Sequence, residues 1–159
     1  MGIRRLNHAV LYVRDAERSA AFYRDVLGFR TVASMPGGAF LQAPGSTNDH
    51  DLALFGIGEH AGPTEAGRRT VGLYHLAWEV GTLAELAEVG QALQAAGALV
   101  GASDHGTTKS LYAHDPDGLE LEVCWVVPAD LLDGAEMTTR PLDLAATIER
   151  YGAATAGGR

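Results

Sequence analysis

The sequence predicts an α+β protein built from two tandem copies of one βαβββ module. A Leu, a His and a Val recur at a constant offset of 67 residues (73 − 6, 75 − 8 and 80 − 13): Leu6, His8 and Val13 return as Leu73, His75 and Val80. Each echoing segment is followed by one run of helical periodicity and then by three short strand-like runs. Gly and Pro residues separate these runs and indicate turns. We therefore expect each module to form a sheet that is covered on one face by a helix.

The first module spans residues 3–56 and begins with a strand predicted over residues 3–13. Alternation along this strand places His8 on the face opposite to Leu11. Asp15 can cap a helix that runs to residue 27, and Gly28 fits its end because glycine readily adopts the left-handed conformation. Three strands are predicted to follow, over residues 30–35, 39–43 and 50–56.

The second module spans residues 71–127 and repeats this order. A strand is predicted over residues 71–80, Thr82 and Glu85 form a capping box at the start of a helix, and Gly97 ends that helix. Three strands follow, over residues 99–103, 110–114 and 119–126. We expect both modules to form one domain over residues 1–127. Residues 128–159 are expected to form a helical tail, with the last four residues disordered.

Composition excludes several classes of function. The formal net charge is −8, and the few basic residues form isolated pairs, which argues against binding to nucleic acid. No apolar run is long enough to span a membrane, and we see no leader-like segment. The lone Cys124 cannot form an intrachain disulfide, which agrees with a reducing compartment. We therefore expect a cytoplasmic protein that binds neither nucleic acid nor membrane.

Alternation in the strands predicts a candidate metal site. If the two modules face one another, His8, His75, Tyr112 and Glu122 can all line one concave cleft. Two imidazoles and one carboxylate are the ligands of a facial metal site with open positions. Glu120 has the same facing as Glu122, so the strand pattern alone does not choose between them. A lone histidine on a strand is more often structural, and only the repetition at matched positions favours metal ligation.

Four motifs within residues 3–127 resemble those of one protein superfamily. They are Leu6-Asn7-His8, the run from Phe22-Tyr23 to Leu27-Gly28-Phe29, Leu73-Tyr74-His75, and Asp115-Pro116-Asp117-Gly118 followed by Glu122. This set resembles the vicinal oxygen chelate superfamily of glyoxalase I, bleomycin-resistance proteins, fosfomycin-resistance enzymes and extradiol dioxygenases. The resemblance implies that His8, His75 and Glu122 bind a divalent metal, and that the protein is a homodimer.

A finer pattern resembles type I extradiol enzymes, which are similar to catechol 2,3-dioxygenase. His105, Tyr112, Asp115-Pro116 and Glu122 follow their signature, and the segment at His50 resembles the one that holds their acid–base histidine. Ser103 departs from that signature, and the best-known enzymes of this type have two such domains. The resemblance implies catalytic roles for His50, His105 and Tyr112. It further implies Fe(II), with Mn(II) or another divalent metal as alternatives, and a small aromatic substrate cleaved with O₂.

Other functions within the superfamily stay open. Glyoxalase I uses a fourth ligand, a glutamate on the last strand of the first module, where this chain has no carboxylate after Asp51. A glyoxalase-like lyase or isomerase and a metal-dependent antibiotic-resistance enzyme are nevertheless alternatives, as is a non-catalytic drug-binding protein. Each catalytic candidate also has a structural interpretation. His50 and His105 can be turn residues, and Tyr112 can be a core aromatic.

Overall fold

The computed structural model describes residues 2–66, 69–132, 134 and 136–158, and it divides into two compact units. The first unit comprises the described residues up to Thr64 together with Pro116–Gly118. The second comprises Glu65–Asp115 and the described residues from Leu119 on. No helix among the described residues combines the length and apolar character needed to cross a membrane.

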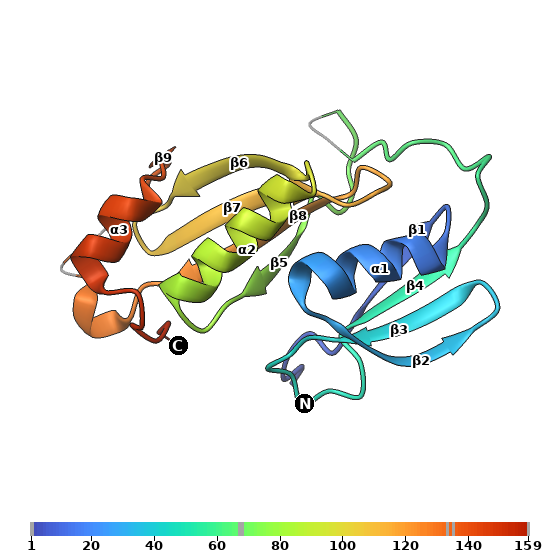
Figure 1. Cartoon of the computed structure of the whole chain (residues 1–159), viewed down its shortest axis with the longest axis horizontal. Helices are drawn as coiled ribbons and strands as arrows, with labels where there is room; N and C mark the ends of the chain where they lie inside the picture. The colour runs from blue at the N-terminus through green and yellow to red at the C-terminus, as the bar shows by residue number, and fades with distance from the viewer. Residues whose placement is uncertain (1, 67–68, 133, 135, 159) are drawn as a thin grey trace. The chain divides into compact units, whose positions relative to one another are not determined.

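The first unit has the predicted βαβββ order. Its elements are β1 (Ala9–Val13), α1 (Ala16–Leu27), β2 (Arg30–Met35), β3 (Gly38–Gln42) and β4 (Leu52–Gly56). The strands form one sheet in the order β1-β4-β3-β2, in which β1 and β4 are parallel (Figure 1). Helix α1 packs on this sheet over a core that includes Leu41, Leu52 and Leu54. The opposite face of β1 carries Val10 and Tyr12, which are both exposed.

Helix α1 begins and ends where its capping residues predict. The Asp15 side chain accepts hydrogen bonds from the backbone N–H groups of Glu17 (2.8 Å) and Arg18 (3.0 Å). Gly28 has a φ of 74°, the left-handed conformation that stops the helix. Both predictions are confirmed.

The second unit repeats the order and extends it. Its elements are β5 (Leu76–Glu79), α2 (Leu83–Ala95), β6 (Leu99–Asp104), β7 (Thr108–His114), β8 (Glu120–Val126), the 3-10 turn η1 (Ala129–Leu131), β9 (Arg140–Pro141) and α3 (Leu144–Tyr151). The sheet order is β5-β8-β7-β6-β9, with β5 parallel to β8. Thr82 and Glu85 form the predicted capping box of α2, whose Leu83, Leu86 and Leu93 are fully buried. The α+β architecture of tandem βαβββ modules is confirmed, whereas the single domain over residues 1–127 stays a prediction.

The opening strand of each module is shorter than predicted. The expected strand over residues 3–13 begins only at Ala9, because its partner β4 begins at Leu52 in the register Ala9↔Leu52. The expected strand over residues 71–80 begins only at Leu76, which pairs with Leu121 near the start of β8. His8 and His75 therefore each stand one residue before the first strand of their module, so the sequence echo is kept.

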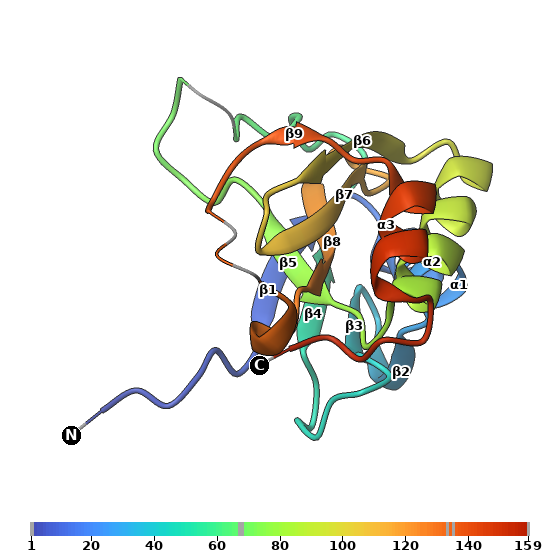
Figure 2. The ribbon, with the colours of Figure 1, turned by 90° about the vertical axis from the view of Figure 1, so that its left-hand side faces the viewer.

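The end of the chain is more ordered than expected. Gly157 N donates to Gly81 O at 2.7 Å, and Gly158 N donates to Val126 O at 3.0 Å. A Cβ at Gly158 would lie 2.4 Å from Pro128 Cα, so this backbone approach requires glycine. The disorder predicted from Ala156 is therefore wrong for the described residues up to 158, while Arg159 lies outside them. Figure 2 shows β9 at the edge of β6 and α3 beside α2.

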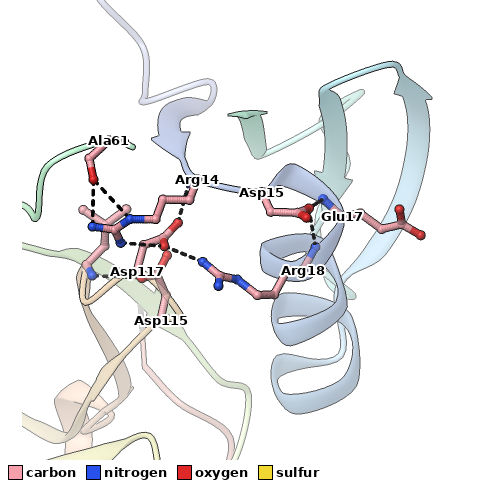
Figure 3. Close-up of polar contacts among 8 residues, drawn as sticks. Arg14, Asp15, Glu17, Arg18, Ala61, Asp115 and Asp117 are labelled. Atoms are coloured by element: carbon pink, nitrogen blue, oxygen red, sulfur yellow. Dashed lines mark hydrogen bonds and ion pairs between the residues drawn. The ribbon is translucent and has the colours of Figure 1, made fainter. Parts of the chain in front are cut away.

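The Asp115–Gly118 segment is a turn, and Asp117 at its tip is bound by two arginines. Asp117 belongs to the first unit, where its carboxylate accepts from Arg14 N (2.7 Å), Arg14 Nη1 (2.9 Å) and Arg18 Nη2 (2.6 Å) (Figure 3). The other edge of the Arg14 guanidinium donates to Ala61 O. Only 6% of the Asp117 side chain is exposed, so its charge is neutralised largely away from water.

Candidate metal and catalytic site

His75 and Glu122 supply two neighbouring donor atoms in the second unit. Glu122 lies on β8 opposite Ala77 of β5, and His75 immediately precedes β5. His75 Nε2 lies 3.0 Å from Glu122 Oε2. A nitrogen and an oxygen that both ligate a metal at about 2.1 Å, with a right angle between them, lie about 3 Å apart. The donor types and their separation therefore fit adjacent positions on one divalent metal ion.

His105 and Tyr112 form a hydrogen-bonded pair on the same sheet. Tyr112 lies on β7 opposite Glu122, and its ring centroid is 6.0 Å from that of His75. His105 lies in the turn between β6 and β7, with Nε2 2.8 Å from Tyr112 Oη. Burial, reinforced by the charge of Glu122, raises the pKa of the Tyr112 hydroxyl. Tyr112 therefore keeps its proton at neutral pH and can act as a donor.

The His105 side chain is held from its other nitrogen. Its Nδ1 lies 2.9 Å from the backbone carbonyl of Thr138, in the segment that precedes β9. Because a carbonyl oxygen only accepts, Nδ1 carries the proton of this bond. In the neutral ring, Nε2 is then the acceptor for the Tyr112 hydroxyl.

A buried lysine supports the turn that carries His105. Lys109 Nζ forms an ion pair with Asp104 and donates to Gly106 O at 3.1 Å. Burial raises the pKa of the Asp104 carboxyl, but hydrogen bonds from Lys109 and from Gly106 N outweigh it and hold that pKa below its usual value. Gly106 has a φ of 77°, and a Cβ there would lie 2.3 Å from Glu136 O. The sequence analysis missed Lys109, although its place within the His105–Tyr112 motif was a usable signal.

In the first unit, His8 and His50 lie side by side. Their ring centroids are 4.5 Å apart, and the Phe40 ring packs edge-on against His50 at 5.3 Å. His50 lies two residues before β4, not within a strand over residues 50–56 as predicted. His8 is exposed, and its Nδ1 lies 2.7 Å from Asn7 Oδ1. Because Nδ1 takes part in that contact, Nε2 is the ring nitrogen of His8 that suits a metal ligand.

A network in the loop before β4 explains why His50 is in this place. The Asp51 carboxylate accepts from Ala43 N (2.8 Å), Ser46 Oγ (2.7 Å) and Asn48 Nδ2 (2.7 Å). Asn48 Nδ2 also donates to Asn7 O at 2.8 Å, which links the loop to the residue beside His8. The chain bends at Asp51, and β4 begins at the next residue. Sequence analysis did not identify Asp51 or Asn48, whose only signal was their place in a turn-rich segment.

The six predicted site residues thus fall into three pairs, each within one unit. They are His8–His50 in the first unit, and His75–Glu122 and His105–Tyr112 in the second. Among the residues that the structure describes, no group of three His, Cys, Asp or Glu side chains is gathered so that it could hold a metal. The metal triad of His8, His75 and Glu122 therefore stays a prediction.

Comparison with known proteins identifies enzymes of similar sequence. The chain is 35% identical over 142 residues to biphenyl-2,3-diol 1,2-dioxygenase 3 of Rhodococcus globerulus. This alignment covers 85% of this chain and 73% of that protein. It is 30% identical over 153 residues to catechol-2,3-dioxygenase of Bacillus subtilis (strain 168). That alignment covers 92% of this chain but 52% of the relative, so the chain spans about half of that protein's length.

A solved structure and a family model agree with these relatives. The crystal structure of a glyoxylase/bleomycin resistance protein/dioxygenase domain from Frankia sp. EAN1pec matches with a TM-score of 0.65. It is 21% identical, and the match covers 80% of this chain and 96% of that one, which shows a shared fold. The model of the Glyoxalase/Bleomycin resistance protein/Dioxygenase superfamily matches residues 5–123. On this evidence, and as its motifs predict, the chain belongs to the glyoxalase/bleomycin resistance protein/dioxygenase superfamily.

Proposed function

We propose that this protein is a metal-dependent extradiol dioxygenase that cleaves a catechol-like aromatic ring with O₂. The observation that carries the proposal is the His105–Tyr112 hydrogen bond on the same sheet as the His75–Glu122 pair. A proton-handling pair next to two metal donors suits a substrate whose hydroxyl oxygens are ligated and deprotonated. Similarity to two proteins named as diol and catechol dioxygenases supports the same reaction.

His75 and Glu122 are proposed to hold the metal together with His8 of the first unit. Fe(II) suits two imidazoles and a carboxylate, and Mn(II) or another divalent metal is the alternative. When bound, the metal supplies Lewis acidity and a template that brings the diol oxygens and O₂ together.

The other predicted residues are proposed to orient the substrate and move protons. Tyr112, whose hydroxyl proton points to His105, would accept a hydrogen bond from a hydroxyl group of the substrate, and His105 would fix the orientation of Tyr112. His50 is proposed as the acid–base group, because histidine is the side chain that most readily exchanges a proton near neutral pH. The Phe40 ring beside His50 favours an aromatic substrate over a strongly polar one.

Oxygen uptake tests this proposal. Protein loaded anaerobically with Fe(II) is mixed with air-saturated buffer and each member of a catechol panel, while O₂ and the ring-opened product are followed. We expect uptake with at least one catechol, and a loss of about 10²-fold or more in kcat for His50→Ala. His60→Ala is the matched control, because His60 is an exposed histidine of the same unit.

Three outcomes would reject the proposal. Lyase or isomerase activity without oxygen, in protein loaded with Mn(II), Ni(II) or Zn(II), would assign the chain to the glyoxalase-like enzymes. An absence of uptake by protein that carries one Fe(II) per chain would also reject ring cleavage. A protein that neither retains nor takes up metal would instead be a binding protein of the bleomycin-resistance type.

A further inference from the structure

Two glutamates project from the same face of β8, and each lies in a different row of side chains across the sheet. In the register of β7 and β8, Glu122 lies opposite Tyr112 and Glu120 lies opposite His114. On the other side, β5 pairs Ala77 with Glu122 and Leu76 with Leu121, so His75 precedes β5 at the level of Glu120. His75 is therefore flanked by Glu120 in its own row and reaches diagonally to Glu122.

The two ring nitrogens of His75 face different carboxylates. Nε2 lies 3.0 Å from Glu122 Oε2, whereas Nδ1 lies 3.8 Å from Glu120 Oε1. The Nδ1 atom is buried and has no hydrogen-bond partner among the residues that the structure describes, although 23% of the His75 side chain is exposed. A buried ring nitrogen without a partner is costly, and Glu120 is an anionic acceptor within ion-pair distance of it.

We propose that Glu120 is a positioning residue that holds the Nδ1 proton of His75 when a metal is bound, so that the lone pair of Nε2 is directed at the metal beside Glu122. Metal-ligating histidines generally donate their second N–H group to a carboxylate or carbonyl, which fixes the tautomer and the ring orientation. Glu120 and Glu122, which the strand pattern alone could not separate, thereby receive different roles. Glu122 is the ligand, and Glu120 acts through His75.

A second histidine, His114, lies on the other side of Glu120. His114 Nε2 lies 3.9 Å from Glu120 Oε2, so the carboxylate stands between two histidines and presents one oxygen to each. The His114 side chain is 47% exposed, whereas that of Glu120 is 22% exposed. The Glu120–His75 contact is therefore less exposed to water than the Glu120–His114 contact. Loss of the Glu120 carboxylate would leave the His75 ring without an acceptor to orient it.

The inference rests on the proposed metal site, and it is tested by metal affinity and by the exchange of the His75 Nδ1 proton with water. Mn(II) binding is measured by electron paramagnetic resonance on the full chain. We expect Glu120→Ala to weaken Mn(II) binding by about 10–100-fold. Glu120→Gln, which keeps an acceptor oxygen, should weaken it less. Glu79→Gln is the matched control, because it removes the same charge about 13 Å along β5 from His75.

The Nδ1 proton of His75 is read by ¹⁵N NMR on protein loaded with diamagnetic Zn(II), because in the metal-free protein Nε2 can itself carry the proton and donate it to Glu122 at 3.0 Å. We expect an Nδ1–H signal that is protected from exchange with water in the wild type, and one that exchanges faster in Glu120→Ala. Unchanged Mn(II) affinity in Glu120→Ala would overturn the inference whatever the catalytic activity. A larger loss in Glu120→Gln than in Glu122→Gln would also overturn it and make Glu120 the ligand. Normal metal binding without oxygen uptake in the wild type would reject the dioxygenase proposal alone, and no Mn(II) binding in the wild type would reject both.

Discussion

Tyr112 Oη and His105 Nε2 lie 2.8 Å apart, at one end of a chain of hydrogen bonds that continues from His105 Nδ1 to the carbonyl of Thr138. The carbonyl acceptor fixes the direction of these hydrogen bonds, because it requires the His105 proton to be on Nδ1. In the neutral ring, the Tyr112 proton then points to His105, and the Tyr112 oxygen is left as an acceptor. The two side chains should therefore function as a unit.

We predict that the kinetic effects of Tyr112→Phe and His105→Gln are not additive. Each variant should lower kcat for ring cleavage by about 10²-fold, because each breaks the same hydrogen bond. The double variant should lose little more than either single variant. Oxygen-uptake kinetics on protein of equal Fe(II) content check this, with His60→Gln as control. A double variant that loses the full product of the two single effects would show that the residues act independently.

The ion pairs of Asp117 should contribute measurably to stability. Asp117→Asn removes the charge that accepts from Arg14 and Arg18, and should lower the free energy of unfolding by about 2–3 kcal/mol. Asp25→Asn is the matched control, since the Arg24–Asp25 pair is mostly exposed and should contribute much less to the free energy of unfolding. Urea titration followed by circular dichroism measures both values. Equal losses of unfolding free energy in the two variants would mean that the burial of Asp117 does not strengthen its ion pairs.

The sequence predicted the helix ends well because their signals are local. Asp15, Thr82 and Glu85 bond to backbone groups within three residues, so the capping pattern and the structure carry the same information. The starts of β1 and β5 were placed too early because a strand extends only as far as its partner. That partner is β4 for one and β8 for the other, more than forty residues away along the chain in each case.

In the candidate site, too, local patterns were predictable from the sequence and contacts between distant residues were not. Alternation on β8 placed Leu121 and Val123 in the core and turned Glu122 to the other face, which agrees with their burial. The contact of His105 with Thr138 could not be predicted, because its acceptor is a backbone carbonyl in a segment without a side-chain signal. The place of His50 beside His8 depends on Asn48, which donates to Asp51 three positions away and to Asn7 O, 41 positions away along the chain.

The Asp104–Lys109 ion pair should make stability depend on pH in the acid range. The pKa of Asp104 is lower in the folded protein than its ordinary value of 3.8. The ionised carboxylate therefore contributes its full stabilisation at pH values above 3.8, and this stabilisation is lost as the pH falls through the pKa of the folded state. Asp104→Asn should therefore cost about 1 kcal/mol at pH 7, a modest effect because a third of the side chain is exposed. The difference from wild type should shrink below about pH 4. Urea titrations at pH 7 and pH 3 test this, and a constant difference would contradict it.

Cys124 should be unreactive in the folded protein. It is buried on β8, and burial, reinforced by the charges of Glu122 and Glu79, raises the pKa of its thiol to about 11. At pH 8 about one thiol in a thousand is then ionised, whereas an ordinary exposed thiol is ionised to about a quarter. The reaction with Ellman's reagent should be several hundred-fold slower than that of a free thiol, and should become fast in urea.

The pH dependence of this reaction separates a high pKa from simple shielding. If the thiolate limits the rate, the rate should rise about tenfold per pH unit between pH 8 and pH 10, because both values lie below the thiol's pKa. The rate can instead be limited by local opening of the sheet, if the exposed thiol reacts faster than the sheet closes again. In that case the rate should rise much less with pH over this range. A variant that combines Cys124→Ser with Ser34→Cys, on the exposed strand β2, supplies the reactive reference thiol. Equal rates for the native protein and this variant at pH 8 would contradict the raised pKa, because the buried strand position would then give the thiol no protection.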